Sequence, residues 1–108
     1  AFPVWMSPTQ VKVLALTDRT ADKCRETVNK LSVLGIRAKA DLRNEKIGFK
    51  IREAQLEKTP YMLIIGDREA EENKVSVRGR KVGDLGTMTF DEFYARIKGE
   101  IESFSSEN

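Results

Sequence analysis

The stretch IRAKADLRNEKIGFKIREAQLEKTPYMLIIG, residues 36–66, decides the fold of this chain. Its first part, IRAKADL, alternates between apolar and polar side chains, which is typical of a strand with one covered face. Its last part, YMLIIG, is apolar on both faces and predicts a central strand that begins after Pro60. Between these parts, Ile47, Ile51 and Ala54 recur at helical spacing. The stretch therefore predicts a strand, a helix and a second strand.

The preceding residues begin the same alternation of strands and helices. VKVLAL, residues 11–16, predicts a further buried strand. The helix that follows has an expected length of about 15 residues from its apolar spacing. We expect Thr20 to be its N-cap and Gly35 to be its left-handed C-terminal stop. Right-handed crossover connections make the first three strands parallel.

The remaining residues predict an antiparallel strand and a final helix. DREAEEN, residues 67–73, is typical of a turn and is too short to hold a crossover helix. KVSVRGR, residues 74–80, alternates again and predicts a fourth, antiparallel strand, and DLGTM adds a short extended piece. Thr89 and Glu92 form a capping box at the start of the last helix. The fold class is therefore α/β, a three-layer sandwich in which helices cover both faces of a mixed sheet.

The composition excludes several kinds of catalytic and metal site. The chain has 108 residues, 40% of them hydrophobic and 33% charged, and we expect one domain over residues 1–108. It has no histidine and a single cysteine, Cys24, which we expect on the apolar face of the first helix, in the hydrophobic core. Nucleophile–histidine pairs, histidine metal sites and internal disulfides are thereby excluded. Catalysis by paired carboxylates remains open.

No segment of the sequence predicts contact with a membrane. The longest apolar run, YMLIIG, is too short to span a bilayer. The first residues, AFPVWMSP, lack the charged start and apolar block of a signal peptide and resemble a chain cut from a longer protein. Since a lone cysteine also fits a reducing compartment, we expect a cytoplasmic location.

The charges are unevenly distributed along the chain. The net charge is only +2, but residues 36–58 hold seven basic against four acidic residues. Residues 89–108 hold two basic against five acidic residues. The middle of the chain is therefore suited to attract a polyanion, whereas its end repels one.

The corner RNEK, residues 43–46, is the first candidate binding site. It follows a strand and precedes a helix, and ligands of parallel α/β sheets gather at such strand ends. Lys46 and Lys50 are four residues apart, so we expect both, with Arg43, to reach phosphates. Asn44 carries a donor and an acceptor, and could therefore read a base edge or cap the helix. Helix capping with solvated charges is the alternative interpretation of the whole corner.

The fourth predicted strand and the turn before it supply the second candidate set. Arg78 and Arg80 share one face of the strand, with Lys81 beyond them, and a guanidinium can bond or stack on a base. An edge strand protected by charge is the alternative. Glu69 could accept hydrogen bonds from the Watson–Crick edge of guanine, although acidic turn residues usually face solvent.

Several motifs together resemble a known family. FPVWMSP, ADLRNEKIGFKIREAQL, TPYMLIIGDRE and KVSVR followed by GDLG occur in this order without large gaps. They resemble the C-terminal anticodon-binding domain of bacterial threonyl-tRNA synthetases, which are class II aminoacyl-tRNA synthetases. The continuous LRNEKIGFKIRE resembles the threonyl enzymes more than the related prolyl, glycyl and histidyl enzymes. The segment RGRKVGDLG departs from relatives that have a threonine and more consecutive arginines.

The resemblance implies a five-stranded mixed sheet with three helices, which grips the anticodon stem-loop of threonine tRNA. It implies anticodon contacts by Asn44, Lys46, Glu69 and Arg78, of which Glu69 and Arg78 would read the G and U of threonine anticodons. Arg43, Lys50 and Arg80 are expected to contact phosphates. The resemblance also implies that ATP, magnesium and zinc are used by a catalytic domain elsewhere in the same chain, with no cofactor and no catalytic residue in these residues. Neither DNA nor a membrane is expected as a partner.

Two other functions remain as alternatives. An accessory or regulatory protein-interaction module could share the fold without reading anticodons. A small flavodoxin-like ligand-binding or carboxylate-dependent enzyme domain would need a pocket with convergent acids, and the sequence shows no such cluster.

Overall fold

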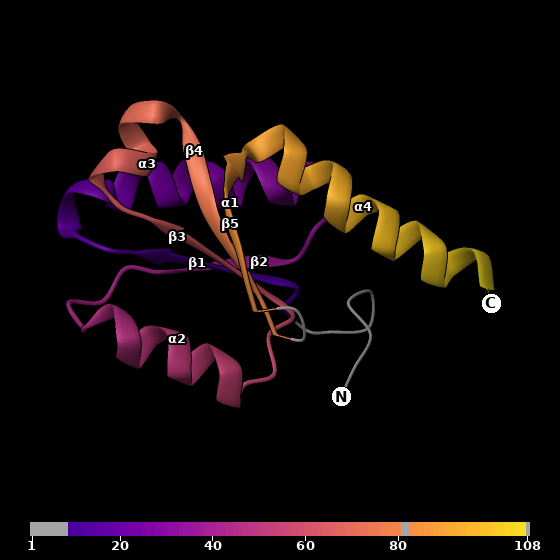
Figure 1. Ribbon diagram of the computed structural model, residues 1–108, viewed down its shortest axis with the longest axis horizontal. Coiled ribbons are helices and arrows are strands. Elements are labelled where there is room, and N and C mark those ends of the chain that lie inside the picture. The colour runs from indigo at the N-terminus through magenta and orange to yellow at the C-terminus, as the bar shows by residue number, and fades with distance from the viewer. Residues whose placement is uncertain (1–8, 81–82, 108) are drawn as a thin grey trace.

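The computed structural model describes residues 9–80 and 83–107 and contains a mixed five-stranded sheet between helical layers. Figure 1 shows helices α1 and α4 over one face of the sheet and α2 over the other. The three-layer α/β fold expected from the sequence is therefore confirmed. In chain order the elements are β1 (Val11–Ala15), a 3-10 helix (Asp18–Thr20), α1 (Ala21–Val33), β2 (Ala38–Asp41), α2 (Ile47–Leu56), β3 (Tyr61–Ile65), α3 (Asp67–Glu72), β4 (Lys74–Gly79), β5 (Gly83–Thr89) and α4 (Phe90–Glu107).

The strand order is β2-β1-β3-β4-β5. Strands β2, β1 and β3 are parallel, whereas β4 is antiparallel to β3 and β5 to β4, as the short connections require. Residues that lie opposite each other share a face of the sheet. One such row crosses all five strands and consists of Asp41, Leu14, Ile64, Ser76 and Thr87.

The two faces of the sheet carry cores of different size. The larger core packs α1 and α4 on the sheet and includes Val13, Leu63, Leu31 and Phe93. Cys24 belongs to this core, as predicted, and burial raises the pKa of its thiol to about 11. The smaller core lies under α2 and joins the three predicted helix residues to the sheet: Ile47, Ile51, Ala54, Leu14, Met62 and Ile64. Because α2 is short, this second face is only partly covered.

Helix α3 replaces the turn that we predicted for residues 67–73. It has six residues and no buried side chain, so the apolar periodicity that marks a longer helix is missing. Its first turn is held by Glu69, whose Oε1 accepts from the Gly66 backbone N–H at 2.8 Å. Asn73 ends it in the left-handed conformation, with φ of 57°. The described chain therefore has four α-helices rather than three.

The expected ends of the longer helices lie at the predicted residues, although one of the expected capping contacts is missing. Gly35 stops α1 with φ of +84°, and the Glu92 N–H donates to Thr89 Oγ1 at 3.2 Å in the capping box of α4. Thr20 is the N-cap residue of α1, as expected, but its side chain makes no cap hydrogen bond. Its buried hydroxyl donates instead to the Ile65 carbonyl at 2.7 Å, which satisfies the hydroxyl and ties the start of α1 to β3.

Candidate functional site

The corner between β2 and α2 exposes two of the predicted contact residues. Asn44 lies in a bend, is exposed, and makes no side-chain hydrogen bond to any residue that the structure describes. The N-cap position of α2 is Lys46, with extended backbone (φ −64°, ψ 142°). A lysine side chain cannot accept hydrogen bonds, so no side chain caps α2 and the capping role considered for Asn44 is wrong. Both side chains are therefore open to a ligand.

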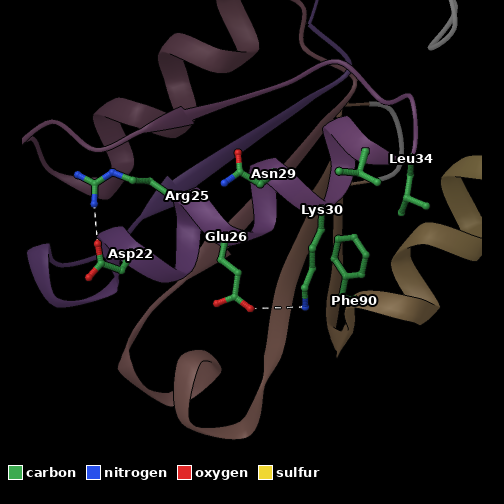
Figure 2. Close-up of a pocket in the computed structure, with 8 residues that line it drawn as sticks. Asp22, Arg25, Glu26, Asn29, Lys30, Leu34 and Phe90 are labelled. Carbon is green, nitrogen blue, oxygen red and sulfur yellow. Dashed lines mark hydrogen bonds and ion pairs between the residues drawn. The ribbon is translucent and has the colours of Figure 1, made fainter.

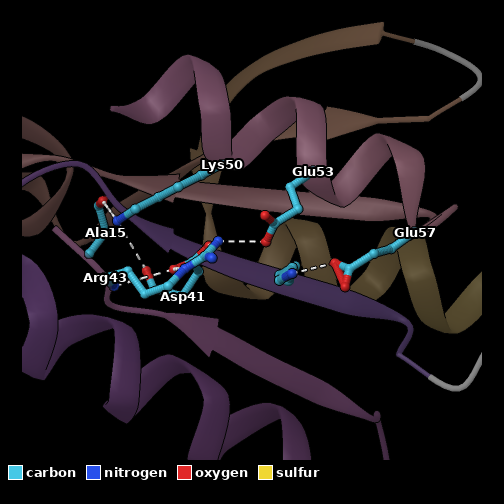
Figure 3. Close-up of polar contacts among 7 residues, drawn as sticks. Ala15, Asp41, Arg43, Lys50, Glu53 and Glu57 are labelled. Atoms are coloured by element: carbon cyan, nitrogen blue, oxygen red, sulfur yellow. Dashed lines mark hydrogen bonds and ion pairs between the residues drawn. The ribbon is translucent and has the colours of Figure 1, made fainter. Parts of the chain in front are cut away.

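Arg43 is held inside the corner by two carboxylates (Figure 3). Its guanidinium donates to both carboxylate oxygens of Asp41 at 2.9 and 2.7 Å and to Glu53 Oε1 at 2.5 Å. Its guanidinium carbon also lies 5.7 Å from the centre of the Phe49 ring. These hydrogen bonds lower the pKa of Asp41 although burial opposes the shift. Arg43 therefore braces the corner, and its charge is already offset where we expected a phosphate.

Lys50 differs from the expectation because it is only 2% exposed. Its Nζ donates to the Ala15 carbonyl at 2.9 Å and to the Asp41 carbonyl at 3.3 Å, as Figure 3 shows. The prediction that Lys46 and Lys50 both point to solvent is wrong for Lys50, because this side chain is enclosed between α2 and the sheet. Its ammonium group joins the ends of β1 and β2 and so supports the start of the corner.

Arg78, from the second candidate set, lies on β4 and faces the same side of the sheet as α2, together with Ser76 of β4 and Thr87 of β5. Arg78 and Ser76 are partly exposed, Thr87 is exposed, and cross-strand pairing places all three on this face. Arg78 has no hydrogen bond or ion pair with another described residue. Arg80 follows β4 and is partly exposed, with its backbone N–H bonded to the Pro60 carbonyl at 2.9 Å. Lys81 lies outside the described residues.

We call the side of β4 and β5 that bears Ser76, Arg78 and Thr87 the open face. Glu69 lies beside it, and both of its carboxylate oxygens have partners. Oε1 accepts from the Gly66 N–H at 2.8 Å, and Oε2 accepts from the Ser76 hydroxyl at 3.3 Å. Gly66 permits this approach because a Cβ there would lie 2.9 Å from Glu69 Oε1 and 2.7 Å from the Leu16 Cδ2. A carboxylate has further lone pairs, so it can accept additional hydrogen bonds.

The fold brings the corner and Glu69 to the carboxyl ends of the parallel strands, whereas Arg78 pairs with Met62 and Arg80 bonds Pro60, both near the start of β3. The corner follows the carboxyl end of β2, and Glu69 follows the carboxyl end of the parallel strand β3, with β1 between them. Sequence reasoning did not assign Ser76 or Thr87 a role. Alternation along β4 gave the signal that Ser76 and Arg78 share a face, but the pairing with Thr87 depends on the register of β5.

A groove of about 620 Å³ lies on the opposite side of the sheet, between α1 and the start of α4. Figure 2 shows that its charged side chains are paired with one another. Arg25 bonds to Asp22 at 2.6 Å, Lys30 lies 3.7 Å from Glu26, and the Lys30 ammonium lies 5.4 Å from the centre of the Phe90 ring. The groove contains none of the residues predicted to contact RNA.

Two kinds of feature are missing from the part of the chain that the structure describes. No group of three or more histidine, cysteine, aspartate or glutamate residues could hold a metal ion among the side chains described in residues 9–80 and 83–99. No helix in those ranges has the length and apolar character needed to cross a membrane.

Comparison with known proteins places the sequence among tRNA synthetase domains. A model of the anticodon binding domain family matches residues 10–100. The threonine–tRNA ligase of Clostridium tetani is 55% identical over 108 residues, which is 100% of this chain and 17% of that protein. The corresponding ligase of Clostridioides difficile is 56% identical over 97% of this chain and 16% of that protein. The chain therefore spans about a sixth of the length of these relatives.

A solved structure shows the same fold. The RNA binding domain of threonyl-tRNA synthetase from Cryptosporidium parvum superposes with a TM-score of 0.87 and is 31% identical in sequence. The match covers 92% of this chain and 25% of that one.

Proposed function

The chain belongs to the anticodon binding domain family, and from this premise we propose that it binds the anticodon loop of threonine tRNA. The observation that carries the proposal is the open face of β4 and β5. There Arg78 lacks a partner among the described residues, while Glu69 retains free lone pairs. Donors and acceptors arranged in this way can pair with the edges of unstacked bases. Anticodon loops expose such edges, whereas duplexes hide them.

The corner would serve the same RNA loop in a different manner. Asn44 and Lys46 are exposed at the carboxyl ends of the parallel strands, where Glu69 also lies. Lys46 can neutralise a phosphate, and the Asn44 amide can bond a base or ribose. Arg43 and Lys50 act indirectly, since one braces the corner through Asp41 and the other ties it to β1. Arg80 is a further candidate for a phosphate contact.

We also propose that this recognition serves a threonine–tRNA ligase. Its relatives carry that name, and each is about six times as long as the matched segment. In this proposal the catalytic domain lies elsewhere in the same chain and uses ATP, magnesium and zinc in the cytoplasm.

Fluorescence anisotropy at low salt tests the proposed function. One labelled stem-loop carries a threonine anticodon and the other has its central G replaced by A. We expect preference for the first loop, and Arg78→Ala to weaken its binding by about ten- to a hundredfold, which corresponds to about 1–3 kcal/mol per base contact. Arg25→Ala on α1 removes the same charge from the opposite side and should leave binding unchanged.

Equal binding of both loops by the unaltered chain would reduce these contacts to general electrostatics. Absence of binding by the folded chain, at concentrations where full-length ligase binds, would favour the protein-interaction module instead.

A further inference from the structure

We propose that the hydroxyl groups of Ser76 and Thr87 are positioning groups that hold the Glu69 carboxylate in one orientation for guanine. The inference rests on the proposed function and adds to it how one base is chosen over another. Neither hydroxyl needs to touch the RNA backbone for this role, so both act on discrimination rather than on general affinity.

The three side chains form a continuous hydrogen-bonded chain across two strands and a helix. Ser76 Oγ lies 3.3 Å from Glu69 Oε2 and 3.2 Å from Thr87 Oγ1. Ser76 and Thr87 are directly paired across β4 and β5, so backbone register holds their hydroxyls together. Glu69 is fixed at its other oxygen by the Gly66 N–H at 2.8 Å. The carboxylate is therefore held at both ends.

The chemistry of these groups determines which atom donates in each hydrogen bond between Glu69, Ser76 and Thr87. A carboxylate only accepts hydrogen bonds, so the Ser76 hydroxyl donates its one proton to Glu69. Because Ser76 has no second proton, it accepts in its bond with Thr87, and the Thr87 hydroxyl is the donor. Two kinds of acceptor thus remain for a ligand on this face, namely the spare lone pairs of Glu69 and those of Thr87.

Arg78 completes the pattern with donors. It lies two residues from Ser76 on the same face of β4, about 7 Å along the strand, and has no partner among the residues described. The Watson–Crick edge of guanine presents one acceptor, O6, beside the donors N1–H and N2–H. Adenine presents an acceptor at N1 instead, which fixed acceptors repel. A carboxylate free to rotate would lose this difference, because it could accept equally from the adenine amino group.

The hydroxyl chain does little for the stability of the fold. Thr87 is exposed and Ser76 partly exposed, and both lie away from the two cores. Substitutions at such positions usually change stability by less than about 0.5 kcal/mol. Loss of one hydroxyl should therefore leave a folded chain whose binding can be measured.

The test compares Ser76→Ala and Thr87→Val with the unaltered 108-residue chain. Dissociation constants are measured for stem-loops with a central G and a central A, and the ratio of the two is the readout. We expect each variant to reduce the preference for G by about fivefold, the equivalent of one ordinary hydrogen bond. Binding of the A loop and the salt dependence should stay unchanged. Ser76→Thr keeps a hydroxyl and should keep the preference.

Three results would overturn the inference. The first is an unaltered G preference in both variants, which would leave the proposed function standing. The second is an equal loss of affinity for both loops, which would indicate a general contact. The third is an unaltered chain without any preference, which would remove the proposed function as well. Thermal unfolding of each variant confirms that a folded chain is compared.

Discussion

Asp41, at the end of β2, is bonded by two cations, one at its side chain and one at its backbone. The Arg43 guanidinium donates to both carboxylate oxygens, and the Lys50 ammonium donates to the Asp41 backbone carbonyl. Asp41 is only 5% exposed, and burial by itself would raise its pKa. The hydrogen bonds from Arg43 outweigh that effect and lower the pKa of Asp41. Ionised Asp41 therefore stabilises the folded corner.

Asp41→Asn should make the free energy of unfolding less dependent on pH in the acidic range. Since the folded state lowers the pKa of this group, its contribution is present above the unfolded value of about 3.9. It is lost as the pH falls through the lower folded value. The variant should unfold at lower urea concentration than the unaltered chain at pH 7. Between about pH 5 and about pH 2 its stability should fall less.

Urea titrations at several pH values, followed by circular dichroism, measure this difference. Asp22→Asn is the control, because Asp22 forms an exposed ion pair with Arg25 on α1. Parallel pH curves for Asp41→Asn and the unaltered chain would contradict the assigned role of Asp41.

Strand β5 decides what the open face presents to a ligand. A register shift between Val77 and Arg78 leaves Leu85 without a partner on β4. Gly86 takes φ of +85° at this irregularity, and its N–H donates to Asp84 Oδ1 at 2.8 Å. Leu85 can thereby pack on the larger core. Thr87 stays paired with Ser76, so the bulge keeps the hydroxyl pair on the open face.

Thr89→Ala should destabilise α4 by about 1 kcal/mol, the usual effect of losing an N-cap. The Thr89 hydroxyl accepts from the Glu92 N–H at 3.2 Å and lies 3.2 Å from the Glu92 carboxylate, so one substitution removes both contacts. Urea unfolding at neutral pH gives the free energy. Ser32→Ala, at an exposed position within α1, should cause no loss. Equal stability of Thr89→Ala and the unaltered chain would show that packing of Phe93 alone holds the start of α4.

At the scale of the whole molecule, the sheet separates two chemically different sides. Helices α1 and α4 cover one face, and α4 belongs to the acidic end of the sequence. Helix α2 covers part of the other face and follows the basic corner. The proposed RNA surface is therefore on the side of α2, and the acidic helix lies on the side that RNA would avoid.

Binding of the anticodon stem-loop should weaken moderately with salt. Neutralising one phosphate of a single strand contributes about −0.7 to the slope of log K against log salt. Lys46→Gln should make the slope shallower by about that amount and weaken the G and A loops equally. Lys98→Gln removes the same charge on α4 and serves as the control. Anisotropy titrations over a range of salt concentrations measure both slopes. An unchanged slope in Lys46→Gln would exclude Lys46 from the phosphate contacts.

Much of the fold could be predicted because its signals are local. The period of two in residues 36–42, the helical spacing of Ile47, Ile51 and Ala54, and the Thr89 capping box each depend on neighbours in sequence. Helix α3 was missed because it is short, exposed and stabilised by one glutamate folding back on Gly66. The exposed Asn44 and Lys46 could also be proposed from the sequence, since nothing in the fold encloses them.

The sequence by itself thus determined the α/β class, the parallel and antiparallel strands, and the residue types available for binding. Only the tertiary structure decided which charges are free. Lys50 and Arg43 have the same net charge as Lys46, yet one is enclosed by two carbonyls and the other is held by two carboxylates. The pairing of Ser76 with Thr87 and Glu69 likewise depends on strand register and on where α3 lies. The physical reason is that exposure and hydrogen bonding depend on residues distant in sequence, which local patterns do not specify.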